Sequence, residues 1–310
     1  GADVTVKNLY FEKAYINSEE IVNENGDQMI YATGGFVGYA TVLTITDCIM
    51  NGVIYGTSST GGMVGEVNDT GIRSSGKSGL VMKNCYNFAD INGANSLGGL
   101  VGQVKQSNYS NRYLQFENCH NNGDIKGYYN RIGGIAGSID TSKETQYSFV
   151  KCSNEGDITA GYLCAGGIAG YITTFRSVKN HSQLSNSGNV TAGNSVGGII
   201  GEAEADGGMN LSRSKIILTD AYNNGKIHST SIRADTRYVG GIMGNSVVSD
   251  GNSKVEISNC FNAGKVTGLK SYAILGNNTL YSQLSNIYSA TVSNSYYLSG
   301  SAAEASHVSG

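Results

Sequence analysis

The chain has 310 residues, of which 44 are Gly, none is Pro and none is Trp. Charged residues make up only 15% and the net charge is −3, so the sequence lacks the basic stripe of a nucleic-acid-binding protein, and no nucleic-acid partner is expected. No apolar run reaches the roughly 20 residues of a membrane-spanning helix, so we expect no membrane insertion. Abundant Gly, Asn, Ser, Tyr, Ile and Val are typical of many short strands joined by tight turns.

A first signature, Gly-Gly followed by two apolar residues and Gly, recurs throughout the chain. A clear copy reads Gly98-Gly99-Leu100-Val101-Gly102. The good copies are far more numerous than chance would give, and a degraded copy covers residues 273–276. In chain order the good copies begin at Gly34, Gly61, Gly98, Gly133, Gly166, Gly197 and Gly240.

A second signature, apolar-x-Asn-Cys-x-Asn-x-Gly-x-Ile, follows the first after a stretch of variable length. Its period is about 35 residues, which lies in the range of stacked repeat proteins. The Cys of this signature, or the residue that replaces it, marks the centre of each repeat. The centres are Leu9, Cys48, Cys85, Cys119, Cys152, Leu184, Ala221, Cys260 and Ser295.

Each repeat predicts three short strands and shows no helical periodicity. In the fourth repeat these strands cover residues 132–139, 149–152 and 157–160. A unit this small buries its apolar face only by stacking on its neighbours. We therefore predict an all-β fold in which residues 1–310 form a single-domain parallel β-solenoid (β-helix) of about eight or nine coils, with degenerate capping coils at both ends. The main alternative is a β-propeller, whose typical blades need four strands and ~40–50 residues.

Stacking turns each repeat position into a row of equivalent residues. The Asn of the second signature is expected at a bend, where Asn tolerates a left-handed backbone and its side-chain amide can bond to the next Asn. The Gly that ends this bend, from Gly52 to Gly264, is expected to supply a positive φ. The Cys position also holds Leu and Ala, which predicts a small buried side chain rather than a metal ligand. The Asn row comprises Asn87, Asn121, Asn154, Asn186, Asn223 and Asn262, and the Cys row comprises Cys48, Cys85, Cys119, Cys152 and Cys260.

Two further residues attract attention as possible reactive groups. Cys164 stands outside the Cys row and is expected to face outward as the one reactive thiol. His120 occupies a position held elsewhere by Tyr or Phe, which predicts a rung of a partly aromatic row. The sequence contains neither a Cys-x-x-Cys pair nor a His-Glu-x-x-His motif, so no metal and no cofactor are expected.

An acidic row is the pattern most similar to an active site. Asp90, Asp124 and Asp157 occupy the same outward position in three successive repeats, and Asn189, Lys226 and Lys265 continue the row. Carboxylates on adjacent strands, about 4.8 Å apart, would approach the ~5–5.5 Å separation of retaining glycosidases. Such a row could also bind Ca²⁺ through its oxygens. Against both readings, Asp is favoured in turns whatever the function, so a structural role is the third interpretation.

The loops after the Gly-Gly signature, at residues 68–78, 106–112, 140–146, 205–214 and 247–253, vary in length while the repeat does not. Loops on a rigid scaffold commonly carry binding. Tyr faces can stack on sugar rings, and Arg supplies directional donors. The candidate ligand-binding residues, in the segments with the most Tyr and Arg, are Tyr109, Arg112, Tyr113, Tyr128, Tyr129 and Arg131.

Together the two signatures resemble the GLUG-motif repeat, which occurs in bacterial surface proteins, in large adhesins and beside the peptidase domain of immunoglobulin A1 proteases. The resemblance covers about residues 4–298. It implies a parallel solenoid at the surface or exterior of a bacterium, with a signal peptide removed. The zinc peptidase motif of those proteases is absent from this sequence.

These observations favour a monomeric, adhesin-like binding or scaffold module without catalysis of its own. A host or dietary glycan or glycoprotein is the expected partner. A polysaccharide-active enzyme that uses the acidic row, and a passive spacer or non-catalytic region of a protease-like protein, are the alternatives.

Overall fold

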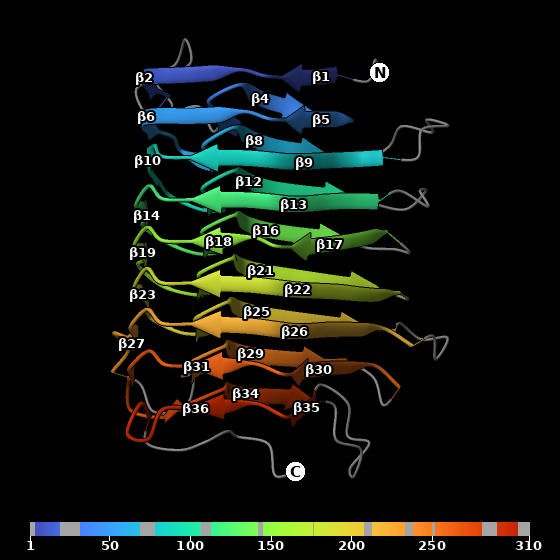
Figure 1. Cartoon of the computed structure of the whole chain (residues 1–310), viewed down its shortest axis with the longest axis vertical. Coiled ribbons are helices and arrows are strands. Elements are labelled where there is room, and N and C mark those ends of the chain that lie inside the picture. Colours follow the sequence, from blue (N-terminus) through green and yellow to red (C-terminus); the bar gives the residue numbers. More distant parts are fainter. Residues whose placement is uncertain are drawn as a thin grey trace, which may run out of the picture.

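The computed structural model describes residues 4–18, 32–68, 78–106, 113–141, 145–175, 177–207, 213–232, 238–249, 252–280 and 290–302. Every strand pairing within these ranges is parallel, and the coils stack along one axis into an upright solenoid (Figure 1). The predicted β-solenoid is therefore confirmed. No helix in the described ranges has the length and apolar character needed to cross a membrane.

The largest sheet has 20 strands and forms the front of the solenoid in Figure 1. Each coil contributes one long arm, which is continuous in some coils and broken in others. The arms are β1 (Val4–Lys7), β2 (Tyr10–Asn17), β5 (Leu43–Thr46), β6 (Ile49–Tyr55), β9 (Ser78–Asn87), β13 (Tyr113–Asn121), β17 (Gln146–Val150), β18 (Ser153–Asn154), β22 (Val178–Asn186), β26 (Lys215–Asn223), β30 (Lys254–Ser258), β31 (Phe261–Asn262), β35 (Ala290–Ser293) and β36 (Tyr296–Tyr297).

A short third strand of each coil continues this sheet around the first corner. We call the outward side of these strands the third-strand face. They are β10 (Asp90–Gly93), β14 (Ile125–Gly127), β19 (Ile158–Ala160), β23 (Val190–Ala192), β27 (Ile227–Ser229) and β32 (Val266–Thr267).

The predicted Gly-Gly strand is divided in two, because the chain kinks at the second Gly. The part before the kink forms one eight-stranded sheet and the part after it forms another, which lies behind the long arms in Figure 1. The first comprises β3 (Ala32–Gly34), β7 (Ser58–Gly61), β11 (Leu97–Gly98), β15 (Ile132–Gly133), β20 (Ala165–Gly166), β24 (Val196–Gly197), β28 (Val239–Gly240) and β33 (Ser271–Tyr272). The second comprises β4 (Val37–Ala40), β8 (Val64–Asn68), β12 (Val101–Gln106), β16 (Ala136–Thr141), β21 (Ala169–Phe175), β25 (Ile200–Asp206), β29 (Met243–Val248) and β34 (Leu275–Leu280).

The Asn row forms the predicted amide ladder in the interior. Asn121 donates from Nδ2 to Oδ1 of Asn154 at 2.7 Å and to the carbonyl oxygen of Gly123 at 2.8 Å. Its neighbours repeat both bonds, and each Asn of the row is at most 1% exposed. A buried amide must be hydrogen-bonded to be tolerated, and here each rung bonds the next.

The two signatures are linked because the Asn row packs against the second Gly of the Gly-Gly pair. A Cβ on Gly134 would lie 2.5 Å from Oδ1 of Asn154 and 2.1 Å from the carbonyl oxygen of Gly167. No side chain other than hydrogen fits such a gap. The close approach of the backbone to this ladder thus explains why the two motifs recur together.

The expected backbone conformations at the bend are wrong. Among the Gly residues that end the bend, only Gly52 has a positive φ, and the Asn row has none. The later Gly residues are needed for proximity instead: a Cβ on Gly156 would lie 2.0 Å from the carbonyl oxygen of Gly123 in the preceding coil. Every coil has a left-handed residue directly before the Cys position, and Ser96, Arg131 and Ser195 add a second one in three coils. The residues directly before the Cys position are Asn8, Asp47, Asn84, Asn118, Lys151, Gln183, Asp220, Asn259 and Asn294.

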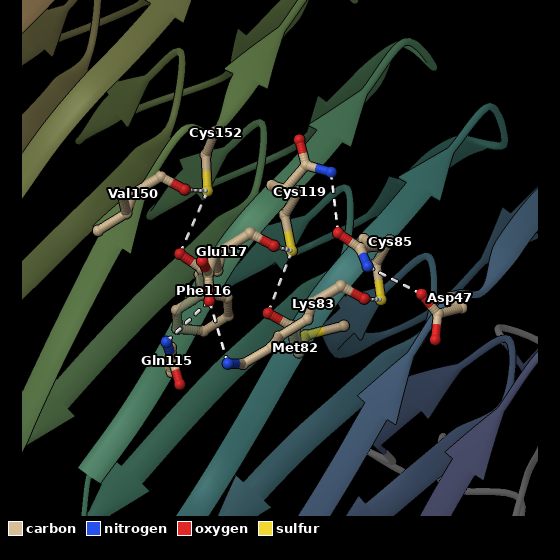
Figure 2. Close-up of polar contacts among 12 residues, drawn as sticks. Asp47, Met82, Lys83, Cys85, Gln115, Phe116, Glu117, Cys119, Val150 and Cys152 are labelled. Atoms are coloured by element: carbon tan, nitrogen blue, oxygen red, sulfur yellow. Dashed lines mark hydrogen bonds and ion pairs between the residues drawn. The ribbon is translucent and has the colours of Figure 1, made fainter.

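The Cys row is buried as predicted, and all six cysteines are free thiols. Figure 2 shows the thiols of Cys85, Cys119 and Cys152 beside backbone carbonyls, and Cys119 donates from Sγ to the oxygen of Met82 at 3.4 Å. The thiols of Cys48 and Cys260 also donate to backbone carbonyls. Burial raises the pKa of the Cys119 thiol well above its usual range. The His120 ring stacks on Tyr86 with a centroid distance of 4.8 Å, which confirms the aromatic row.

Two inward positions on β22 break the apolar pattern of the core. Lys179 pairs in register with Ile216, and His181 pairs with Leu218. Both are buried, at 0% and 1% exposed. Lys179 donates from Nζ to the carbonyl oxygen of Thr145 and to Oγ of Ser177.

Candidate functional site

The acidic row lies on successive coils, as predicted, but each carboxylate has a structural task. Oδ1 of Asp90 accepts a hydrogen bond from the backbone N–H of Asp124 at 3.0 Å. Oδ1 of Asp124 accepts in the same way from Asp157 at 2.8 Å, and Oδ1 of Asp157 from the N–H of Asn189 at 2.8 Å. The row therefore ties each third strand to the next coil. This contact explains the Asp residues without a substrate.

The three carboxylates do not gather into a metal site. Within the described ranges, no group of three or more His, Cys, Asp or Glu side chains could hold a metal ion. This arrangement gives the cation-binding interpretation of Asp90, Asp124 and Asp157 no support. Their side chains are exposed, and they follow one line along the solenoid axis instead of surrounding a point.

The predicted Tyr- and Arg-rich site is divided by the structure. Tyr109 and Arg112 lie outside the described residues, as do most of the long loops. Tyr113 begins β13, whereas Tyr128 and Tyr129 follow β14, and Figure 1 shows the start of β13 and the strand β14 on opposite sides of the solenoid. Tyr113 thus belongs to a different surface from the other two tyrosines.

Tyr128, Tyr129 and Tyr162 form one exposed edge at the corner between the third strand and the Gly-Gly strand. They are 61%, 56% and 61% exposed. The backbone N–H of Tyr162 donates to the carbonyl oxygen of Tyr129 at 3.0 Å, so the two residues are successive rungs. Later coils carry Ile232 (93% exposed) and Leu269 (67% exposed) after the same strand of the coil. We call the three tyrosines the tyrosine edge.

A polar cleft lies on one side of the tyrosine edge, between the corner turns and β21 and β25. Its space is about 310 Å³, at the lower end of the range for small-molecule sites. The Arg131 guanidinium carbon lies 4.2 Å from the ring centroid of Tyr171, within the range of a cation–π contact. We call this the arginine cleft, and its lining consists of Asn95, Ser96, Asn130, Arg131, Leu163, Cys164, Tyr171 and Glu202.

Hydrogen bonds fix the acidic side of the arginine cleft. Oε2 of Glu202 accepts from Oγ of Ser195 and from Nδ2 of Asn245, both at 2.9 Å. The Tyr171 hydroxyl donates to Oε2 of Glu204 at 2.5 Å, and burial together with this carboxylate raises the pKa of Tyr171. The cleft therefore presents an arginine and a carboxylate on two coils that are separated by the coil of Tyr171.

The prediction of an outward, reactive Cys164 is wrong. Its side chain is 6% exposed in the wall of the arginine cleft. Burial, followed by the nearby Glu202 carboxylate, raises the pKa of this thiol far above its ordinary value. Since only the thiolate is strongly nucleophilic, Cys164 is an inert wall residue.

Two shallow depressions complete the surface around this corner. A corner pocket is lined by Gly161, Tyr162, Leu163, Gly193, Asn194, Thr230, Ser231 and Ile232. On the third-strand face, a groove of about 480 Å³ is lined by Asp157, Asn189, Thr191, Lys226, His228, Lys265 and Thr267. We call the second of these the lysine groove.

Several of these residues were not predicted as site residues. Tyr162 could have been found, because it occupies the repeat position of Tyr129. Tyr171 and Glu202 gave no signal in the sequence, because their cleft depends on the angle between two sheets.

Comparisons with protein-family models, with curated proteins and with solved structures gave no match.

Proposed function

We propose that the chain is a non-catalytic, adhesin-like binding module for a glycan or glycoprotein, located at the exterior or surface of a bacterium. The observation that carries the proposal is the tyrosine edge with a polar cleft or pocket on either side. A row of exposed aromatic rings with a polar rim is typical of an interaction site. Tyr offers an apolar face and a polar hydroxyl, which suits the alternating surfaces of a sugar ring.

The resemblance to GLUG-motif repeats supports the same proposal. A solenoid can display equivalent side chains on successive coils about 4.8 Å apart, so an extended ligand can contact several coils at once. The arginine cleft would then orient the ligand, because its guanidinium and carboxylate are held in place before binding. Each stacked sugar would bury apolar ring surface that the free protein leaves in water.

The test is retention of the purified chain on a broad glycan and mucin array. The double variant Tyr128→Ala/Tyr162→Ala should lose at least tenfold in apparent affinity for whatever the wild type retains. Tyr296→Ala is the matched control, since Tyr296 is 66% exposed on another row, and it should bind like the wild type. Unchanged retention by the double variant, or an array that retains nothing, contradicts the proposal.

A further inference from the structure

The third-strand face has segregated charge along one of its outward rows, and Lys126 lies on the neighbouring outward row. Its outer row begins with the acidic residues of three successive coils, passes through Asn189 and ends with Lys226 and Lys265. The backbone N–H of Lys226 donates to Oδ1 of Asn189 at 3.2 Å, which continues the pattern of the acidic row. One line of side chains therefore carries a negative half and a positive half.

The two lysines are neighbours without a counter-ion. Ile227 donates its N–H to the carbonyl oxygen of Lys265 at 2.8 Å, so Lys226 and Lys265 belong to adjacent coils, each directly before its third strand. Both are exposed, and neither ammonium has a carboxylate partner among the described residues. Like charges on adjacent coils repel, and an anion between them would remove that repulsion.

Neutral and cationic donors complete the lysine groove. His228 pairs in register with Thr267, and its Nδ1 lies 2.9 Å from Oγ1 of Thr267. The other ring nitrogen of His228 has no hydrogen-bond partner in the described part of the chain. Two ammonium groups, an imidazole and the hydroxyls of two threonines thus face one depression, and Asp157 is the sole carboxylate of its lining.

We propose that the lysine groove binds one carboxylate or sulfate group of an acidic sugar. The preference for a sugar rests on the proposed function, whereas the preference for an anion rests on the groove alone. The negative half of the same row limits the length of the anion. A long polyanion such as nucleic acid would run from the lysines onto Asp157, Asp124 and Asp90, where like charges repel it.

The neighbouring surface indicates the direction in which the rest of the ligand extends. Thr191 and His228 line the lysine groove. Two residues later in the same two coils, Gly193 and Thr230 line the corner pocket together with Tyr162. A ligand with its acidic group between the lysines can therefore cross the coils toward the tyrosine edge. Its axis is then across the solenoid, away from the acidic row.

The test follows the amide NMR signals of residues 226–228 and 265–267 during titration at low ionic strength, where exposed charges are least screened. The probes are glucuronate, glucose 6-sulfate and glucose. We expect saturable shifts with one or both anions and none with glucose. If glucuronate binds more tightly, the site selects carboxylate; if glucose 6-sulfate does, it selects sulfate.

Matched variants assign the site. Lys226→Gln/Lys265→Gln should weaken the anion at least tenfold, whereas Lys83→Gln/Lys151→Gln, with the same change in net charge on the long arms, should not. Absence of saturable shifts with both anions, equal shifts with glucose, or full affinity in the first double variant overturns the proposal. The tyrosine variants separate this outcome from the proposed function, because they should keep the binding of the small anions.

Discussion

Replacement of Lys179 by Met tests how much the burial of this ammonium group destabilises the core. The side chain is 0% exposed and points inward on β22, at a position where the next coil has Ile216. Burial lowers the pKa of Lys179 from 10.5 to about 7. Because the unfolded chain binds this proton more readily than the folded chain, protonation favours unfolding.

The size of the effect follows from these two pKa values. Their difference corresponds to about 5 kcal/mol, at about 1.4 kcal/mol per pH unit. Met would remove this penalty but leave Thr145 and Ser177 without the donor that Lys179 supplies, a loss of about 1–1.5 kcal/mol for each bond. We expect Lys179→Met to stabilise the fold by about 2 kcal/mol at pH 7.

The pH dependence gives this prediction its sharpest test. The penalty is complete below pH 7, decreases as the pH rises and has largely disappeared at pH 10.5, so the advantage of Met should disappear over the same interval. Urea unfolding followed by far-UV circular dichroism measures both chains at each pH. Hydrogen exchange of residues 145–150 and 178–186 reports whether the change is local. A variant that is less stable than the wild type at pH 7, or an advantage that does not depend on pH, would refute the reasoning.

Three other outcomes follow from the same core. Burial, and next the charge of Lys179, lowers the pKa of His181 to about 3, so the wild type should lose stability as the pH falls from 6.5 to 3, and His181→Leu should remove this part of the loss in urea melts. Asn154→Ala removes three buried hydrogen bonds of the ladder and should cost about 3–5 kcal/mol, whereas Asn122→Ala on the exposed side should change stability by less than about 0.5 kcal/mol. A thiol reagent should label Cys164 only after urea unfolding, and fast labelling of the folded chain would contradict its burial.

Much of the fold could be predicted because stacking makes the sequence redundant. A metal-ligating position cannot hold Leu184 or Ala221 in place of Cys, so the Cys row was predicted to be structural packing. The Asn ladder followed similarly from the recurrence of an amide at one position. Short strands, parallel pairing and buried rows are all consequences of a period that repeats many times.

The features that escaped prediction depend on geometry within one coil. The positive φ was expected at the Gly of the bend and occurs before the Cys position, because the chain turns at residues such as Asn118. Cys164 was expected outside because it lacks a row partner, yet the angle between two sheets encloses it. Lys226 and Lys265 were visible in the sequence as the end of the acidic row. Only the groove around them suggests that they act together.

The amide ladder has a consequence for how such a protein can change in length. Each inner rung donates one hydrogen bond to the following coil and accepts one from the preceding coil, always in the same sense. At the two ends of the row, Met50 and Tyr297 occupy the equivalent position. Duplication or deletion of one whole inner repeat would therefore leave every amide satisfied, whereas a partial repeat would interrupt the row. Duplication or deletion of whole repeats can thus lengthen or shorten the rod by complete coils and shift the binding surface along its axis without redesign of the interior.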